Sequence, residues 1–170
     1  MSKIIIVDRN DNEIGVKERS EITHDDIYRV SGLWLINDKG EILLAQRSFN
    51  KHPAHSPGKW GPAVAGTVEE DETYEENIKK EIEEELGVKT LDLKETEKKF
   101  RDTGVRRYFV KIFTSVLDKP AEEFVIPKDE VEQVKWFSKD ELRQWVEDKP
   151  EDFVTSMKEI FEEMEVLDGK

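Results

Sequence analysis

The first half of the chain is dominated by short runs in which apolar residues alternate with polar ones. A period of two places successive side chains on opposite faces of a sheet, so these runs predict β-strands. The sequence NDKG (37–40), between two such runs, is typical of a tight hairpin turn. The pattern predicts an N-terminal β-hairpin at about residues 1–20 and further strands at 28–37, 40–48 and 61–66.

The spacing of apolar residues becomes helical at residues 73–86. Thr73 and Glu76 form the S/T-x-x-E pattern of a capping box, and Gly87 stands where a glycine commonly ends a helix. A helical wheel brings three apolar residues into one stripe: Ile78, Ile82 and Leu86. The sequence therefore predicts an amphipathic helix that buries this stripe.

The rest of the chain continues with strands and ends with helices. Strand patterns cover 91–102, 105–117 and 131–138, and helical patterns cover 138–148 and 151–167. No internal repeat or linker interrupts them. We expect one mixed α/β domain over residues 1–170, with C-terminal helices at about 138–167.

Charge and composition narrow the class of protein. The 170 residues carry a net charge of −13, which argues against nucleic acid or an anionic membrane as a partner. The chain has no cysteine, which excludes disulfides, thiol catalysis and cysteine-based zinc sites. Its apolar runs are too short for a signal peptide or a membrane span, so a cytoplasmic protein is expected.

Three carboxylates gather on one face of the predicted helix. Glu81, Glu84 and Glu85 lie beside the apolar stripe, where the helix meets the rest of the fold. Like charges at this spacing repel, and they cost free energy at the edge of a core unless they are neutralised. A hard divalent cation such as Mg²⁺ would neutralise them, and the carbonyl of Gly66 could add a ligand. The alternative is a solvated acidic face in a glutamate-rich chain.

Residues 66–88 resemble the signature of the Nudix hydrolase family, G-x5-E-x7-R-E-U-x-E-E-x-G-U, where U is a bulky apolar residue. Gly66 and Glu72 match its first two fixed positions, and Glu81 to Val88 match its last part. The one departure is Lys80, which stands in place of the arginine. The resemblance implies an α/β/α sandwich with a mixed β-sheet between helices.

The resemblance also implies roles for individual residues. Glu81, Glu84 and Glu85, with the Gly66 carbonyl, would bind Mg²⁺ or Mn²⁺, while Lys80 would pair with Glu72. The expected catalytic residues are Glu84, Glu81 and Glu130. Glu84 is the preferred base, and Glu130 is the candidate outside the motif.

The implied reaction is metal-dependent hydrolysis of a P–O–P linkage. The substrate would be a small molecule, either a nucleoside diphosphate linked to another group or a related organic diphosphate. Because dimers are common in this family, a homodimer is among the states that the resemblance allows. An alternative is a non-catalytic binding module of the same family, which loss of a motif glutamate would mark, but all of these glutamates are present.

The order of segments around the motif looks like the isopentenyl-diphosphate-isomerase-like branch. Most of the isomerase residues are replaced, since Ala65, Thr67, Arg29, Arg106 and Tyr108 stand at the expected cysteine, histidine and glutamate positions. His24 is the position that matches. An isomerase is therefore the weaker alternative, because the residues for alkene protonation are missing and the hydrolase motif is nearly intact.

Three basic residues near the Pro-rich loop could contact phosphate. Arg47 follows an apolar strand, and Lys51 and Lys59 lie in the loop after it. In an acidic chain, a local basic cluster is a candidate anion site, although single Lys and Arg residues are more often solvated. His52 and His55 lie in the same loop without an acidic motif beside them.

Overall fold

The longest strand explains the layout of the sheet. In the computed structural model, which describes residues 2–169, β3 (Ile27–Ile36) pairs in parallel with β9 (Arg107–Val116) along its whole length. On its other side it meets three strands in turn, β1 (Lys3–Val7), β6 (Val64–Thr67) and β4 (Ile42–Arg47). All the strands in residues 2–169 belong to one mixed sheet. The others are β2 (Glu13–Glu18), β5 (Trp60–Pro62), β7 (Lys94–Glu95), β8 (Lys99–Asp102) and β10 (Val131–Phe137).

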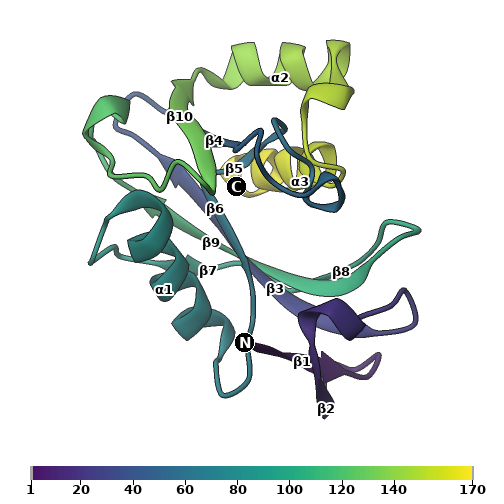
Figure 1. Cartoon of the computed structure of the whole chain (residues 1–170). Coiled ribbons are helices and arrows are strands. Elements are labelled where there is room, and N and C mark those ends of the chain that lie inside the picture. The colour runs from purple at the N-terminus through teal and green to yellow at the C-terminus, as the bar shows by residue number, and fades with distance from the viewer. Residues whose placement is uncertain (1, 170) are drawn as a thin grey trace.

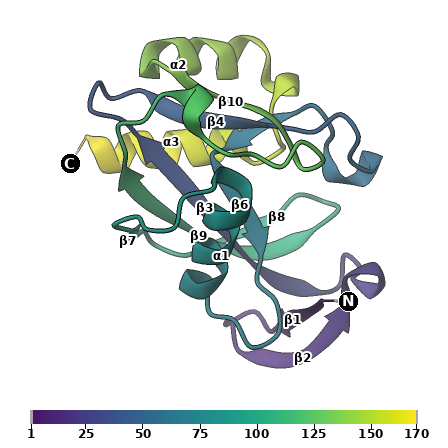
Figure 2. The same cartoon turned by 60° about the vertical axis from the view of Figure 1, so that its left-hand side comes forward.

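Helices cover both faces of the sheet (Figure 1). Alternation along β3 sends Leu33 and Leu35 to one face, where the apolar stripe of α1 (Tyr74–Leu86) packs. Trp34 points to the other face, which is covered by α2 (Lys139–Asp148) and α3 (Met157–Asp168). Figure 2 shows α1 and the α2–α3 pair separated by the sheet. The expected α/β/α sandwich with a mixed sheet is confirmed.

The helix bounds follow local sequence signals. Thr73 and Glu76 form the expected capping box, and Gly87 ends α1 with a φ of 68°. Ile78, Ile82 and Leu86 are buried, as the stripe predicts. Ser138 caps α2 in the same way, through a box with Glu141.

Two segments predicted as continuous strands are interrupted. The segment 61–66 changes partner at the buried Ala63: β5 pairs with β4, whereas β6 pairs with β3. The segment 91–102 forms two short strands, β7 and β8, which both pair with β9. Three residues lie between Glu95 and Lys99, but only two lie between their partners Phe113 and Val110 on β9, so a bulge breaks the ladder.

The last helix begins later than its pattern suggests. Residues 150–152 form a 3₁₀ turn, and α3 starts at Met157 and not near Glu151. Phe153 is held in an extended conformation, where it bridges to Trp60 and stacks edge-on against Trp145. Burial of this ring in the core therefore overrides the helical periodicity.

The N-terminal segment forms a hairpin at the end of the molecule away from α2 (Figures 1 and 2). Asp11 at its turn is buried and accepts hydrogen bonds from Arg29, Tyr74 and Lys98. These contacts tie the hairpin to β3, to α1 and to the segment between β7 and β8. Within residues 2–169, the helices are all too short or too polar to be candidate membrane spans.

Candidate active site

A buried polar residue fixes α1 against the sheet. The side chain of Asn77 is fully buried, and its Oδ1 accepts a hydrogen bond from the Ser31 hydroxyl of β3 at 2.5 Å. Its Nδ2 donates to the Thr67 carbonyl and to Glu72. Sequence reasoning missed this anchor. The available signal is a polar residue directly beside the apolar stripe, where an unsatisfied amide would be costly.

Lys80 lies between two carboxylates at the start of the motif. Its Nζ contacts Glu72, the partner that the family resemblance implies, and also Glu69 at 3.1 Å. Burial raises the pKa of Glu72, but the hydrogen bond from Lys80 contributes to lowering it overall. Burial likewise lowers the pKa of Lys80, but its contacts with Glu72 and Glu69 raise it overall. A single ammonium group thus bridges the loop before α1 to the helix. Glu69 was not foreseen from the sequence.

The carboxylates of α1 differ in their surroundings. Glu81 and Glu85 are half-buried, whereas Glu84 is exposed. Burial, with repulsion from Glu84, raises the pKa of Glu81 to about 7. Burial, with repulsion from Glu81, raises the pKa of Glu85 to about 8, although Arg47 and Lys51 oppose this rise. Without a nearby cation, both carboxyls therefore hold a proton more tightly than an ordinary glutamate does.

Gly66 faces this cluster from β6. A Cβ at Gly66 would lie 2.5 Å from Cγ of Glu81, so any larger residue would displace that carboxylate. The close approach brings the backbone of β6 against the acidic face of α1. It supplies a physical reason for glycine at the first position of the motif.

The donor chemistry of this cluster fits a hard divalent cation. Half-buried carboxylates with raised proton affinity, beside a closely approaching backbone, are the kind of oxygen ligands that Mg²⁺ and Mn²⁺ take. Within residues 2–169, however, no three acidic or histidine groups converge into a ready-made cage. Mg²⁺ sites commonly use one or two carboxylates with water and substrate phosphates, so a closed protein cage is not required.

Two basic residues lie near the carboxylates of α1. Arg47 ends β4, is half-buried, and lies near enough to Glu85 and Glu130 to attract both. Lys51 forms an ion pair with Glu130 and also favours the ionised form of Glu85. Arg47 and Lys51 therefore lie beside the α1 carboxylates, together with Glu130.

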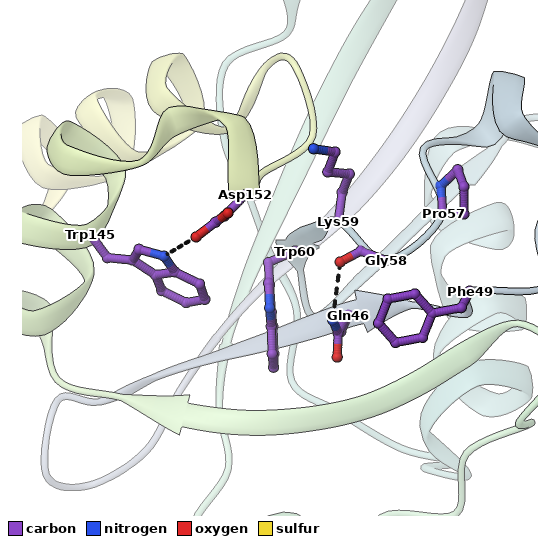
Figure 3. A pocket seen from close by; sticks show the side chains of 8 residues that line it. All are labelled: Gln46, Phe49, Pro57, Gly58, Lys59, Trp60, Trp145 and Asp152. Carbon is purple, nitrogen blue, oxygen red and sulfur yellow. Dashed lines mark hydrogen bonds between the residues drawn. The ribbon is translucent and has the colours of Figure 1, made fainter.

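Lys59 lies elsewhere. Its Nζ donates to the carbonyl of Glu151, and its side chain lines a cavity of about 400 Å³ on the α2 side of the sheet (Figure 3). Trp60 and Trp145 line the same cavity, and Trp145 Nε1 donates to Asp152 at 2.7 Å. Lys59 is thus turned away from the carboxylates of α1, and its predicted phosphate contact lacks support from this arrangement.

Several residues at the positions of the isomerase machinery make other contacts in this structure. Arg29 is paired with Asp11, which commits its guanidinium to the N-terminal hairpin. Thr67 accepts a hydrogen bond from Arg19, and His24 contacts Asp102. Ala65 is exposed on the sheet.

The comparisons with known proteins agree with this architecture. The NUDIX domain family model matches residues 27–164. An uncharacterized Nudix hydrolase of Pseudomonas aeruginosa is 32% identical over 115 residues, which are 67% of each chain. The chain belongs to the Nudix family, and this relative supports a hydrolase of that family.

Other matches define the branch and the fold. An isopentenyl-diphosphate Delta-isomerase of Burkholderia multivorans is 26% identical over 157 residues, covering 89% of this chain and 86% of the isomerase. The resemblance to the isomerase-like branch is therefore confirmed. The crystal structure of DR0079 from Deinococcus radiodurans aligns with a TM-score of 0.72 at 21% identity, covering 85% of this chain and 88% of that one. At that identity, the match shows the shared fold.

Proposed function

We propose that this protein hydrolyses the diphosphate linkage of a small organic diphosphate with the help of Mg²⁺ or Mn²⁺. The observation that carries this proposal is the pair Glu81 and Glu85, whose pKa values are raised to about 7 and about 8 on one helix face. Gly66 lies directly against this face, and Arg47 and Lys51 are near enough to favour the ionised form of Glu85. Hydrolysis of a diphosphate needs acidic groups to bind the cation and basic groups to bind the phosphates.

Each residue has a distinct task in the proposal. Glu81, Glu84 and Glu85, with the Gly66 carbonyl, hold the cation, which when bound neutralises phosphate oxygens and acidifies water. Arg47 and Lys51 hold the phosphates and balance their charge. Glu72 and Lys80 keep the start of α1 in place, since Lys80 bridges Glu72 and Glu69.

Glu84 is the proposed base. It is the exposed member of the trio and therefore the one open to water and substrate. Glu130 is the second candidate, but it is already engaged by Lys51. A base must be within reach of the attacking water, and the exposed Glu84 meets this condition beside the proposed cation site.

A second candidate function is isomerisation of isopentenyl diphosphate, which the isomerase relatives favour. Against it, the chain has no cysteine, and Ala65 stands at the expected cysteine position. Isopentenyl diphosphate therefore belongs in the substrate panel, where isomer formation and phosphate release separate the two reactions.

The test is a screen of nucleoside and prenyl diphosphates with Mg²⁺, followed by Glu84→Gln on the best substrate. Turnover should fall about 100-fold or more, because a positioned base and a metal ligand each contribute on that scale. Glu83→Gln is the matched control, since Glu83 is the exposed neighbour on the same helix. Equal turnover in both variants would rule out the proposed role of Glu84 and make Glu130 the next residue to test.

A further inference from the structure

The side chain of Asn77 on α1 bonds to both strands that meet at Gly66. Gly66 of β6 lies directly opposite Ser31 of β3 in the sheet. The Ser31 hydroxyl donates to Asn77 Oδ1 at 2.5 Å. Asn77 Nδ2 donates at 3.1 Å to the carbonyl of Thr67, the residue that follows Gly66. One amide therefore holds the residue opposite Gly66 and the residue next to it.

Glu81 lies one helical turn beyond Asn77 on the same face of α1. Residues four apart in a helix are neighbours on its surface. Glu81 is the residue that packs against Gly66, because a Cβ at Gly66 would lie 2.5 Å from its Cγ. The hydrogen bonds of Asn77 and the close contact of Glu81 thus occupy consecutive turns of α1 along the same short strand. A shift of Asn77 relative to β6 would move Glu81 relative to Gly66.

The same amide also reaches the loop before α1. Asn77 Nδ2 donates to a carboxylate oxygen of Glu72 at 2.8 Å. Glu72 accepts a second hydrogen bond from the backbone N–H of Glu69 at 3.0 Å and pairs with Lys80. Asn77 therefore joins three segments that are separate in the sequence: β3, β6 and the loop that leads into the helix.

Simple packing does not account for an amide at this position. Asparagine is a weaker helix former than leucine or alanine, and a buried amide costs free energy unless it is hydrogen-bonded. Asn77 is fully buried beside Ile78, and each of its polar atoms has a partner. A buried network in which every group is satisfied favours one arrangement of its elements over others.

We propose that Asn77 is a positioning residue for the cation site and sets the distance between the Gly66 backbone and the Glu81 carboxylate. The inference rests on the proposed function, which places the cation at these two groups. Asn77 acts through β6 and α1 and has no contact with substrate in this proposal. Substitution of residues that orient metal ligands typically lowers metal affinity about 10-fold to 100-fold.

The competing explanation is that the Asn77 network only stabilises the fold. Ser115 provides a matched control, since it is a buried serine on β9 whose hydroxyl donates to the carbonyl of Asp92 at 2.8 Å. Ser31→Ala and Ser115→Ala each remove one buried hydroxyl hydrogen bond from a strand, but only Ser31 bonds to Asn77. A purely structural role predicts equal metal affinity in the two variants, whereas a positioning role predicts weaker binding in Ser31→Ala.

The experiment measures binding of Mn²⁺ alone, without substrate, by electron paramagnetic resonance. Asn77→Ala should weaken binding about tenfold or more, and Ser31→Ala about threefold or more. Ser115→Ala should stay within about twofold of the wild-type protein. Urea unfolding checks that each variant is folded and should show a lower midpoint for all three.

The proposal is overturned if Asn77→Ala and Ser31→Ala lose stability but bind Mn²⁺ as tightly as Ser115→Ala does. If Asn77→Ala fails to fold, the comparison of Ser31→Ala with Ser115→Ala decides the question alone. A second measurement is the Mn²⁺ concentration that gives half-maximal turnover. It should rise about tenfold in Asn77→Ala, and excess Mn²⁺ should restore part of the lost turnover, because mass action offsets weaker binding.

These outcomes separate the inference from the proposed function. If Mn²⁺ binding depends on Asn77 but no diphosphate is hydrolysed, the positioning role stands and the hydrolase proposal fails. If diphosphates are hydrolysed and Asn77→Ala needs no more Mn²⁺ than the wild-type protein, the positioning role fails and the hydrolase proposal stands. A wild-type protein that binds no Mn²⁺ would overturn both.

Discussion

At the scale of single residues, Lys80 is the informative departure from the family motif. An arginine could reach two carboxylates with a planar fork, whereas lysine offers one ammonium group. Here that ammonium group bridges Glu72 and Glu69. The contact with Glu69 uses a hydrogen-bond donor of Lys80 that its pairing with Glu72 leaves free. Lysine is therefore compatible with the local geometry, and it also opposes the rise in the pKa of Glu81 that burial causes.

We predict that Lys80→Arg keeps or improves turnover, while Lys80→Ala lowers both turnover and stability. The stability loss should be up to about 1 kcal/mol, because the pair is partly exposed. The measurements are steady-state kinetics and urea unfolding. Lys79→Ala is the control, since Lys79 pairs with Glu75 on an exposed part of the same helix. If Lys80→Ala behaves like this control, the pairing is dispensable here.

At the scale of elements, α1 carries the site and is destabilised by it. Its capping box and C-terminal glycine favour the helix, but Glu81 and Glu85 repel each other beside its buried stripe. Both carboxyls bind a proton more tightly in the folded chain than in the unfolded one, where a glutamate has a pKa of about 4.3.

The stability of the metal-free protein should therefore fall as the pH rises from about 5 to about 8. In this range the folded state binds more protons than the unfolded state, and stability decreases wherever that holds. Glu85→Gln should flatten the dependence, and Glu83→Gln should retain it. Urea unfolding in a chelating buffer at several pH values measures this, and a stability that rises over the same range would contradict it.

At the scale of the whole molecule, the candidate site lies where layers meet. α1 supplies carboxylates, β6 supplies Gly66, and the end of β4 supplies Arg47. A cation bound there would join the helix layer to the sheet in the folded state alone. It should therefore stabilise the complete domain and not a single element.

We predict that Mg²⁺ or Mn²⁺ raises the melting temperature at pH 8. At 100 times Kd, the gain in free energy of unfolding is about 2.7 kcal/mol. Glu83→Gln should respond like the wild-type protein, and Glu85→Gln should respond less. A melting temperature unchanged by millimolar concentrations of either cation would remove the main support for metal dependence.

The sequence by itself determined the elements whose signals are local. The capping box of Thr73 and Glu76, the stripe of Ile78, Ile82 and Leu86 and the shared face of three glutamates follow from a period of 3.6 residues. The alternating strands and the NDKG turn depend equally on neighbours in the chain. These features, with the motif, were enough to predict the sandwich and the acidic face.

Only the tertiary structure decided what depends on partners distant in the chain. Strand pairing breaks the segment 61–66 at Ala63, because its two ends pair with different strands. Asn77 is an anchor because Ser31 lies opposite it, and Lys59 faces away from the acidic site because its Nζ bonds to the carbonyl of Glu151. Arg47 and Arg106 hydrogen-bond to adjacent residues of one loop because the sheet brings them together. Their spacing along the chain could not predict this contact.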